Sequence, residues 1–228
     1  MLQFSIVEQV ILAVFLLSGI TFFLYHLLLR LKIVLKGKSD FSVDELPKRI
    51  IRVFDEVILH KKVVSGDRKS AGILHALVMY GFIFFGLITI NHFGMAFGFP
   101  IFSESFRHTY FLIFGAPWAI LCTIGILGLA YRRFVIKPEA LGKFSSTSAL
   151  VSVFIVTLMT TYLIDELHIL SGAAEKFNWW LHSGVIGGFL FLIPQSKHMH
   201  LVLSPFNIFL RPFEVPNHGA IPIDMEAS

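Results

Sequence analysis

Five segments of this 228-residue chain are apolar over roughly 20 residues, the length that an α-helix needs to cross the hydrocarbon core of a membrane. Backbone amides and carbonyls in lipid must pair within the segment, so we predict that each segment is a helix. The hydrophobic share of 55% and the mean hydropathy of +0.75 exclude an ordinary soluble domain. The sequence therefore predicts an all-α membrane protein, a five-transmembrane-helix bundle within residues 1–203. The five segments are 6–29, 73–97, 110–131, 148–170 and 179–200.

Lys and Arg fall almost entirely on one side of this predicted bundle. Of the 19, all but Arg107 and Lys176 lie between the first and second segments, between the third and fourth, or beside the end of the fifth. The positive-inside rule then places the N-terminus outside and the C-terminus in the cytoplasm. We expect a multi-pass protein of the cell inner (cytoplasmic) membrane, with no nucleic acid partner.

Two stretches outside the spans have their own patterns. Residues 47–64 carry apolar side chains at helical spacing with Arg49 and Arg52 on the other side, which predicts an amphipathic helix. This helix either lies in the membrane interface or forms a docking surface for a soluble partner. The proline-rich residues 204–228 predict an extended cytoplasmic tail, a second region after the membrane domain.

Four histidines indicate a cofactor. His182 and His200 are eighteen residues apart, five whole turns, so on one continuous helix they would share a face about 27 Å apart. His75 begins the second segment at the predicted depth of His200, and His92 lies at the predicted depth of His182. Antiparallel helices would then offer His75 with His200 at an inner level and His92 with His182 at an outer level. Two bis-histidine sites predict two b-type haems (haem b) and electron transfer.

Three features leave alternatives open. His75 and His92 are seventeen residues apart, about 100° from a shared face in an ideal helix, and His108 and His168 are alternatives to His92. Pro194 interrupts the last segment between its two histidines. His60 is expected to lie in a solvated loop.

The outer rim and the single cysteine complete the predicted chemistry. Asp165 and His168 are predicted to handle protons for a quinone at the outer end, where they lie among several polar residues. A solvated rim, or a quinone site near His26 and Lys197, is the alternative. Cys122 is the only cysteine and is expected to pack in a helix, so an iron–sulfur cluster must come from a partner.

The residues that carry these patterns resemble a known family. The runs 70–75, 131–138, 179–182 and 196–200 look like the dihaem cytochrome b family of the respiratory nitrate reductase gamma subunit, and more closely like its heterodisulfide-reductase-related membrane oxidoreductase branch. The resemblance implies five helices, a cytoplasmic haem on His75 and His200, and an outer haem on His182. The family's second histidine on the second helix is replaced here by Phe85.

The resemblance also implies partners. It points to a cytoplasmic iron–sulfur subunit or domain of the heterodisulfide-reductase type, to electron-transferring flavoprotein as a donor in some members, and to the menaquinone pool. We therefore predict an electron-transfer subunit that links an iron–sulfur partner to membrane quinone. The alternative is a non-redox membrane anchor or transporter subunit whose histidines are structural or relay protons, and an optical spectrum separates the two.

Overall fold

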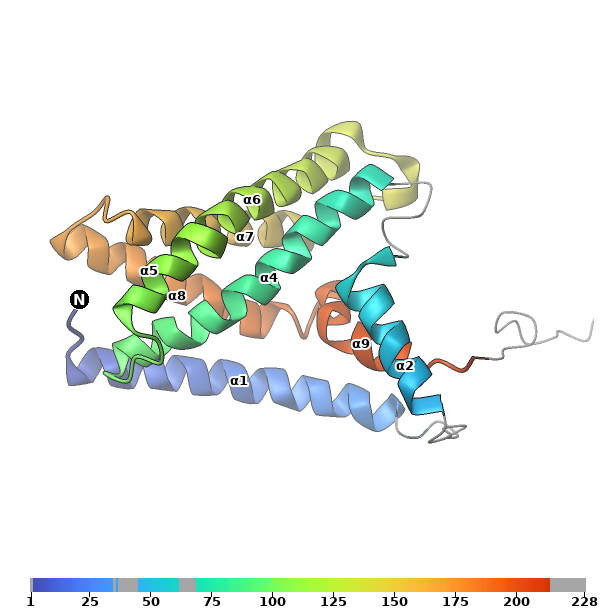
Figure 1. The fold of residues 1–228 in the computed structure, drawn as a ribbon, viewed down its shortest axis with the longest axis horizontal. Coiled ribbons are helices and arrows are strands. Elements are labelled where there is room, and N and C mark those ends of the chain that lie inside the picture. Colours follow the sequence, from blue (N-terminus) through green and yellow to red (C-terminus); the bar gives the residue numbers. More distant parts are fainter. Residues whose placement is uncertain (1, 35, 37–44, 62–68, 214–228) are drawn as a thin grey trace, which may run out of the picture.

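The computed structural model describes residues 2–34, 36, 45–61 and 69–213, and these residues are helical with no strand among them (Figure 1). Four helices are long and apolar enough to cross a membrane, as expected of a multi-pass membrane protein. The helix α8 (Gly172–Leu192) has the length for a fifth span but is not among these four. The four are α1 (Ile6–Val34), α4 (Lys69–Ala96), the composite helix Glu104–Ile136, and α7 (Ser146–Glu166).

The composite helix changes its winding along its length. It runs as α5 (Glu104–Tyr110), a π-helical turn η3 (Phe111–Gly115), α6 (Ala116–Tyr131) and a second π-helical turn η4 (Arg132–Ile136). Pro117 in the first turn of α6 has no N–H for the carbonyl four residues earlier, so the chain widens into η3 just before it.

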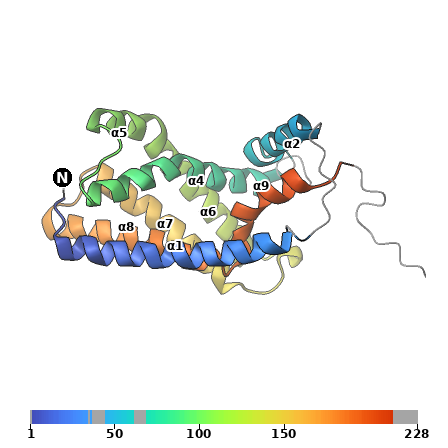
Figure 2. The ribbon, with the colours of Figure 1, turned by 90° about the horizontal axis from the view of Figure 1, so that it is seen from below.

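The long helices pack in a chain of neighbours. The helix α4 packs on α6, α6 on α7, α7 on α8, and α8 on α1, so that α1 lies along the edge of the bundle (Figures 1 and 2). Small residues bring the helices close, as is usual in membranes. A Cβ added at Gly125 of α6 would lie 2.8 Å from the Leu74 carbonyl oxygen of α4, and one added at Gly187 of α8 would collide with the Phe15 ring of α1.

The predicted last segment is not one helix. The helix α8 begins at Gly172, ends at Leu192 and is followed by a turn that contains the buried Pro194. A short 3-10 turn, η6 (Lys197–Met199), then leads into α9 (His200–Leu210). The prediction of a single helix with both histidines on one face is therefore wrong, because Pro194 cannot donate a hydrogen bond to continue α8.

The start of the predicted extended tail is also helical. The helix α9 continues to Leu210 with Pro205 inside it, so the prediction of an extended chain is wrong for residues 204–210. Tertiary contacts offset the cost of this proline: Arg49 donates to the carbonyls of Phe209 and Arg211 at 2.9 and 3.2 Å. These bonds satisfy carbonyls that a helix end leaves without partners. Residues 214–228 lie outside the described residues.

The donors to α9 come from the predicted amphipathic segment. This segment forms α2 (Leu46–Val53) and the π-helical turn η2 (Phe54–Ile58), while residues 62–64 lie outside the described residues. Ile50, Ile51 and Phe54 are exposed, whereas Arg49 is 1% exposed and faces α9. The basic side of α2 thus holds the chain's own α9 and is not an open docking surface.

Candidate functional site: two histidine pairs

The structure brings the four predicted histidines together in the two predicted pairs. The ring centroids of His75 and His200 are 6.0 Å apart, and those of His92 and His182 are 5.0 Å apart. The 100° offset between His75 and His92 on α4 does not prevent the two pairs from forming, because His200 and His182 lie on separate helices, α9 and α8. The pairing in space is confirmed, and haem ligation remains a prediction.

A large apolar cavity adjoins the His75–His200 pair. Its volume is about 320 Å³, within the range of roughly 300–1,000 Å³ that is typical of small-molecule and cofactor sites. Residues of α4, α6, α7 and α8 line its apolar wall, among them Met79, Phe82, Ile126, Ile155 and Phe189. The cavity is therefore built at the meeting point of four helices, with both imidazoles on its lining.

The hydrogen bonding of this pair suits metal ligation. The His200 Nδ1 lies 2.8 Å from the Lys197 carbonyl oxygen, which can only accept, so the neutral ring carries its proton on Nδ1 and has its lone pair on Nε2. Metal-bound histidines commonly donate their other N–H to a backbone carbonyl in this way. The His75 Nδ1 is buried and has no hydrogen-bond partner among the described residues.

Cationic side chains surround the same cavity. Arg132, Arg133 and Lys197 line it, and the buried Arg133 Nε has no hydrogen-bond partner in the described part of the chain. Burial, with the nearby charge of Arg133, lowers the pKa of Lys197. Burial also lowers the pKa of His198 to about 4, helped by the charge of Lys197, so this ring is neutral at pH 7. Cations that form no ion pair among the described residues, beside an apolar cavity, favour an amphiphilic ligand with carboxylates at one end.

The His92–His182 pair is packed more tightly. The His182 Nδ1 lies 2.7 Å from the Thr161 hydroxyl, which also lies 2.7 Å from the Thr157 carbonyl oxygen. If the hydroxyl donates to that carbonyl, its oxygen accepts from His182 and leaves the Nε2 lone pair of His182 available. The His92 Nε2, in contrast, is 2.9 Å from the Ser183 hydroxyl.

A small cavity of about 50 Å³ lies beside this second pair, and we call it the polar cavity because charged side chains line part of its otherwise largely apolar wall. It has room for a few water molecules but is well below the usual size of a cofactor site. Asp165, Glu166 and Arg107 line it, and Arg107 Nη1 lies 3.5 Å from Glu166 Oε1. The Tyr162 hydroxyl on its wall is buried, with no hydrogen-bond partner in the described structure.

Other predicted outer residues are placed differently. His168 and His108 are not among the residues that line the polar cavity, and His168 lies in the turn between α7 and α8 with φ of 51°. Asn91 lines the cavity, but its Oδ1 accepts from the Ile101 and Phe102 amides at 2.9 Å and fixes the loop after α4.

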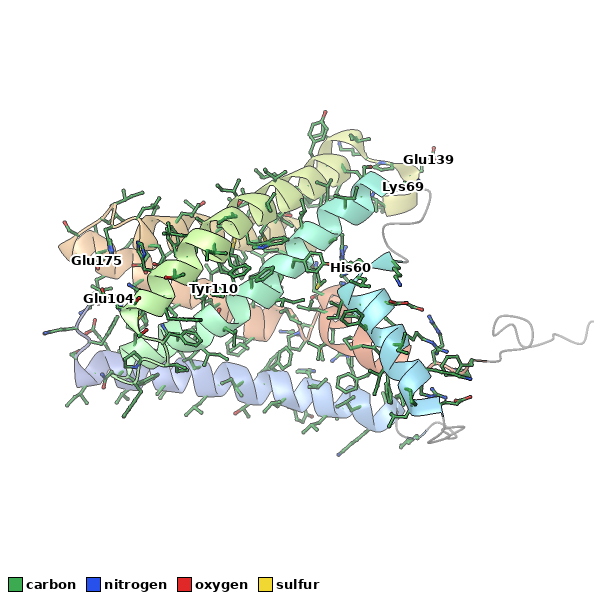
Figure 3. The ribbon with its side chains drawn as sticks, in the orientation of Figure 1. His60, Lys69, Glu104, Tyr110, Glu139 and Glu175 are labelled. Atoms are coloured by element: carbon green, nitrogen blue, oxygen red, sulfur yellow. The ribbon has the colours of Figure 1, made fainter. Side chains whose placement is uncertain are left out.

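Sequence reasoning missed one residue of the site. His60 was expected to be solvated, but it is 5% exposed, and its ring centroid lies 6.0 Å from that of His75. Figure 3 shows it at the end of the α2–η2 segment, near α4 and α9. A histidine beside a loop carries no local signal of burial, so only the tertiary structure could reveal it.

Thiolate chemistry is absent from the described site. Cys122 is buried against Gly81 in the α4–α6 contact, as expected for a packing residue, and no group of three or more His, Cys, Asp or Glu that could hold a metal ion occurs among the described residues. The fold and the site thus define an all-helical, membrane-type bundle with one imidazole pair at each end.

Two curated proteins are similar to the chain over most of its length. It is 30% identical to the probable iron-sulfur-binding oxidoreductase FadF of Bacillus subtilis (strain 168) over 224 aligned positions, which cover 84% of the chain and 31% of FadF. It is 23% identical to the EtfAB:quinone oxidoreductase of Syntrophomonas wolfei over 245 positions, 88% of the chain and 33% of that protein. The chain thus spans about a third of the length of either relative. No family model and no solved structure match the sequence.

Proposed function

We propose that this chain is the membrane part of a quinone-linked oxidoreductase, which passes electrons between an iron–sulfur partner and membrane quinone through haem b. The observation that carries the proposal is the His75–His200 pair on a 320 Å³ cavity with a basic rim. The names of the two relatives, an iron–sulfur-binding oxidoreductase and a quinone oxidoreductase, support the same class of reaction. In this proposal α8 is the fifth span, the α9 end faces the cytoplasm, and the quinone is menaquinone.

The spacing of the pair fits a metal between the rings. Two metal–imidazole bonds of about 2 Å each, together with the distance from each ring centre to its nitrogen, amount to roughly 6 Å between centroids. The observed 6.0 Å matches this separation. Haem b would supply a one-electron relay here. His75 and His200 would hold its iron, and the apolar wall would exclude water from it.

The basic rim would fix the orientation of the cofactor. Carboxylates of a haem form strong charge-assisted hydrogen bonds with guanidinium groups. Arg132 and Arg133 come from the end of the composite helix, and Lys197 comes from the turn before α9. All three line the cavity and would be the residues that pair with the carboxylates of a bound haem.

The His92–His182 pair fits a haem in its donors but not in its space. His182 can present Nε2, but the centroids are 1.0 Å closer than in the other pair, the His92 Nε2 is bonded to Ser183, and the cavity holds about 50 Å³. We therefore base no step on a second haem. If a second haem does bind here and brings electrons to this end, Asp165 on the polar cavity is the residue that we assign to proton exchange with quinone.

The decisive experiment is the haem-to-protein ratio and the reduced-minus-oxidised spectrum of the purified chain. We expect a b-type spectrum, with haem lost or high-spin in His75→Ala and His200→Ala. His108→Ala, at an exposed residue of α5 that lines neither cavity, is the matched control. A haem-free protein, or wild-type spectra in both variants, contradicts the proposal and favours a non-redox anchor or transporter.

The haem-to-protein ratio also shows at which end of the bundle the quinone reacts. Two haems per chain mean that the His92–His182 pair opens to bind the second one and can deliver electrons to quinone near Asp165. One haem means that electrons leave from the His75–His200 site, so the quinone must react at the α9 end, near His26 or Lys197.

A further inference from the structure

His60 is held in an unfavourable backbone conformation at a buried position. Its φ is 51°, in the left-handed region, which costs roughly 1–3 kcal/mol for a residue other than glycine. Such a conformation persists only where the surroundings fix it. Here the Tyr80 hydroxyl donates to the Ile58 carbonyl at 2.6 Å, and the Tyr80 ring lies 5.7 Å from the His60 ring. The local fold therefore directs His60 inward, toward α4.

His60 meets His75 there, and each ring has an unused nitrogen. The Nδ1 atoms of both residues are buried and have no hydrogen-bond partner among the described residues. A centroid distance of 6.0 Å is too long for a direct hydrogen bond between most orientations of the rings. It matches two rings joined by one water, with about 2.8–3.0 Å for each bond, and buried waters usually satisfy polar groups of this kind.

We propose that His60 is a positioning residue for His75, and this inference rests on the proposed function. The His75 Nδ1–H donates to a bridging water, which donates in turn to the Nδ1 lone pair of His60. This arrangement fixes the proton of His75 on Nδ1 and turns its Nε2 toward His200 and the cavity. His75 thereby gains the outer hydrogen-bond partner that ligating histidines usually have, as His200 does from the Lys197 carbonyl.

The rest of the α2–η2 segment explains how His60 keeps its place. Arg49 and Arg52 of α2 donate to carbonyls at the end of α9, and Arg211 pairs with Glu56 of η2 at 2.5 Å. The segment that ends at His60 is thus fastened to the helix that begins with His200. The α2–η2 segment and α9 are held together by these bonds and carry His60 and His200, the two imidazoles on either side of His75. A displacement of α2 would therefore shift the His75–His200 pair.

The test compares two replacements that share the backbone strain and differ in hydrogen bonding. His60→Leu removes the acceptor, whereas His60→Gln keeps a polar group of similar reach. We expect His60→Leu to weaken haem retention roughly 10–100-fold, the usual effect of losing an outer-shell partner. We also expect it to raise the haem midpoint potential and to change the low-spin electron paramagnetic resonance signal. His60→Gln should restore most of both properties.

Three outcomes overturn the inference. The first is a wild-type potential, spectrum and haem content in His60→Leu. The second is an equal change in both variants, which would show that His60 only fills space. The third is a change of the same size in the control His108→Ala, at an exposed residue of α5 that lines neither cavity. A wild-type protein without haem has a different meaning, because it rejects the proposed function itself.

Discussion

Replacement of Arg49 by Met should release α2 from α9 while leaving the long helices in place. Met keeps the apolar stem and removes the charge, so the Phe209 and Arg211 carbonyls lose the Arg49 donor in a site where Arg49 is 1% exposed, and the Arg211 carbonyl keeps its bond from Arg52. The loss of one buried hydrogen bond from a charged donor costs about 1.5–3 kcal/mol, and we count only the bond to Phe209 because Arg52 still donates to the Arg211 carbonyl. The half-exposed ion pair with Glu45 at 2.8 Å adds only about 0.5 kcal/mol. The sum is about 2–3.5 kcal/mol for the local docking of α2 on α9.

Hydrogen exchange measures this docking directly. At 1.4 kcal/mol per factor of ten, the amides of α9 should exchange roughly 30–300-fold faster in Arg49→Met, if they exchange by local opening. Amides of α4 and α6 should be unchanged, which is the internal control, and Arg49→Lys should fall between the variant and the wild type. If exchange in α9 stays within threefold of the wild type, the clamp between α2 and α9 does not hold the segment and our reasoning is refuted.

Two further predictions concern the bundle and its polar end. Asp165→Asn should slow quinone-dependent haem oxidation at least tenfold with unchanged haem spectra, because an amide cannot exchange protons. The control is Glu175→Gln, at a partly exposed residue of the same end, which should have no effect. Equal turnover in both variants would show that Asp165 takes no part in the quinone reaction. Gly125→Ala should lower the thermal midpoint in detergent by an amount equivalent to about 1–3 kcal/mol, since its Cβ would press on the Leu74 carbonyl. Gly86→Ala, which has open space around it, is the control, and similar midpoints would contradict the close α4–α6 packing.

The membrane class and the partner choice of the histidines could be predicted from the sequence alone. Lipid requires every backbone group to be paired within a helix, so long apolar segments leave few alternatives. Helix rise converts residue number into depth, which is why His75 could be matched with His200, and His92 with His182. The depth of a residue in the membrane depends only on its position along its own helix, so hydropathy and residue spacing are enough to predict it.

The tertiary structure decided what depends on contacts between distant segments. Pro205 predicted a break, but donors from α2 keep α9 helical around it, and these donors are about 160 residues away in the sequence. Pro194, in contrast, does end a helix, so the same residue type has opposite outcomes in two contexts. His60 became part of the site because α2 docks on α9 and turns it toward His75. A proline inside a helix costs about 3 kcal/mol, and a few buried hydrogen bonds can outweigh that cost.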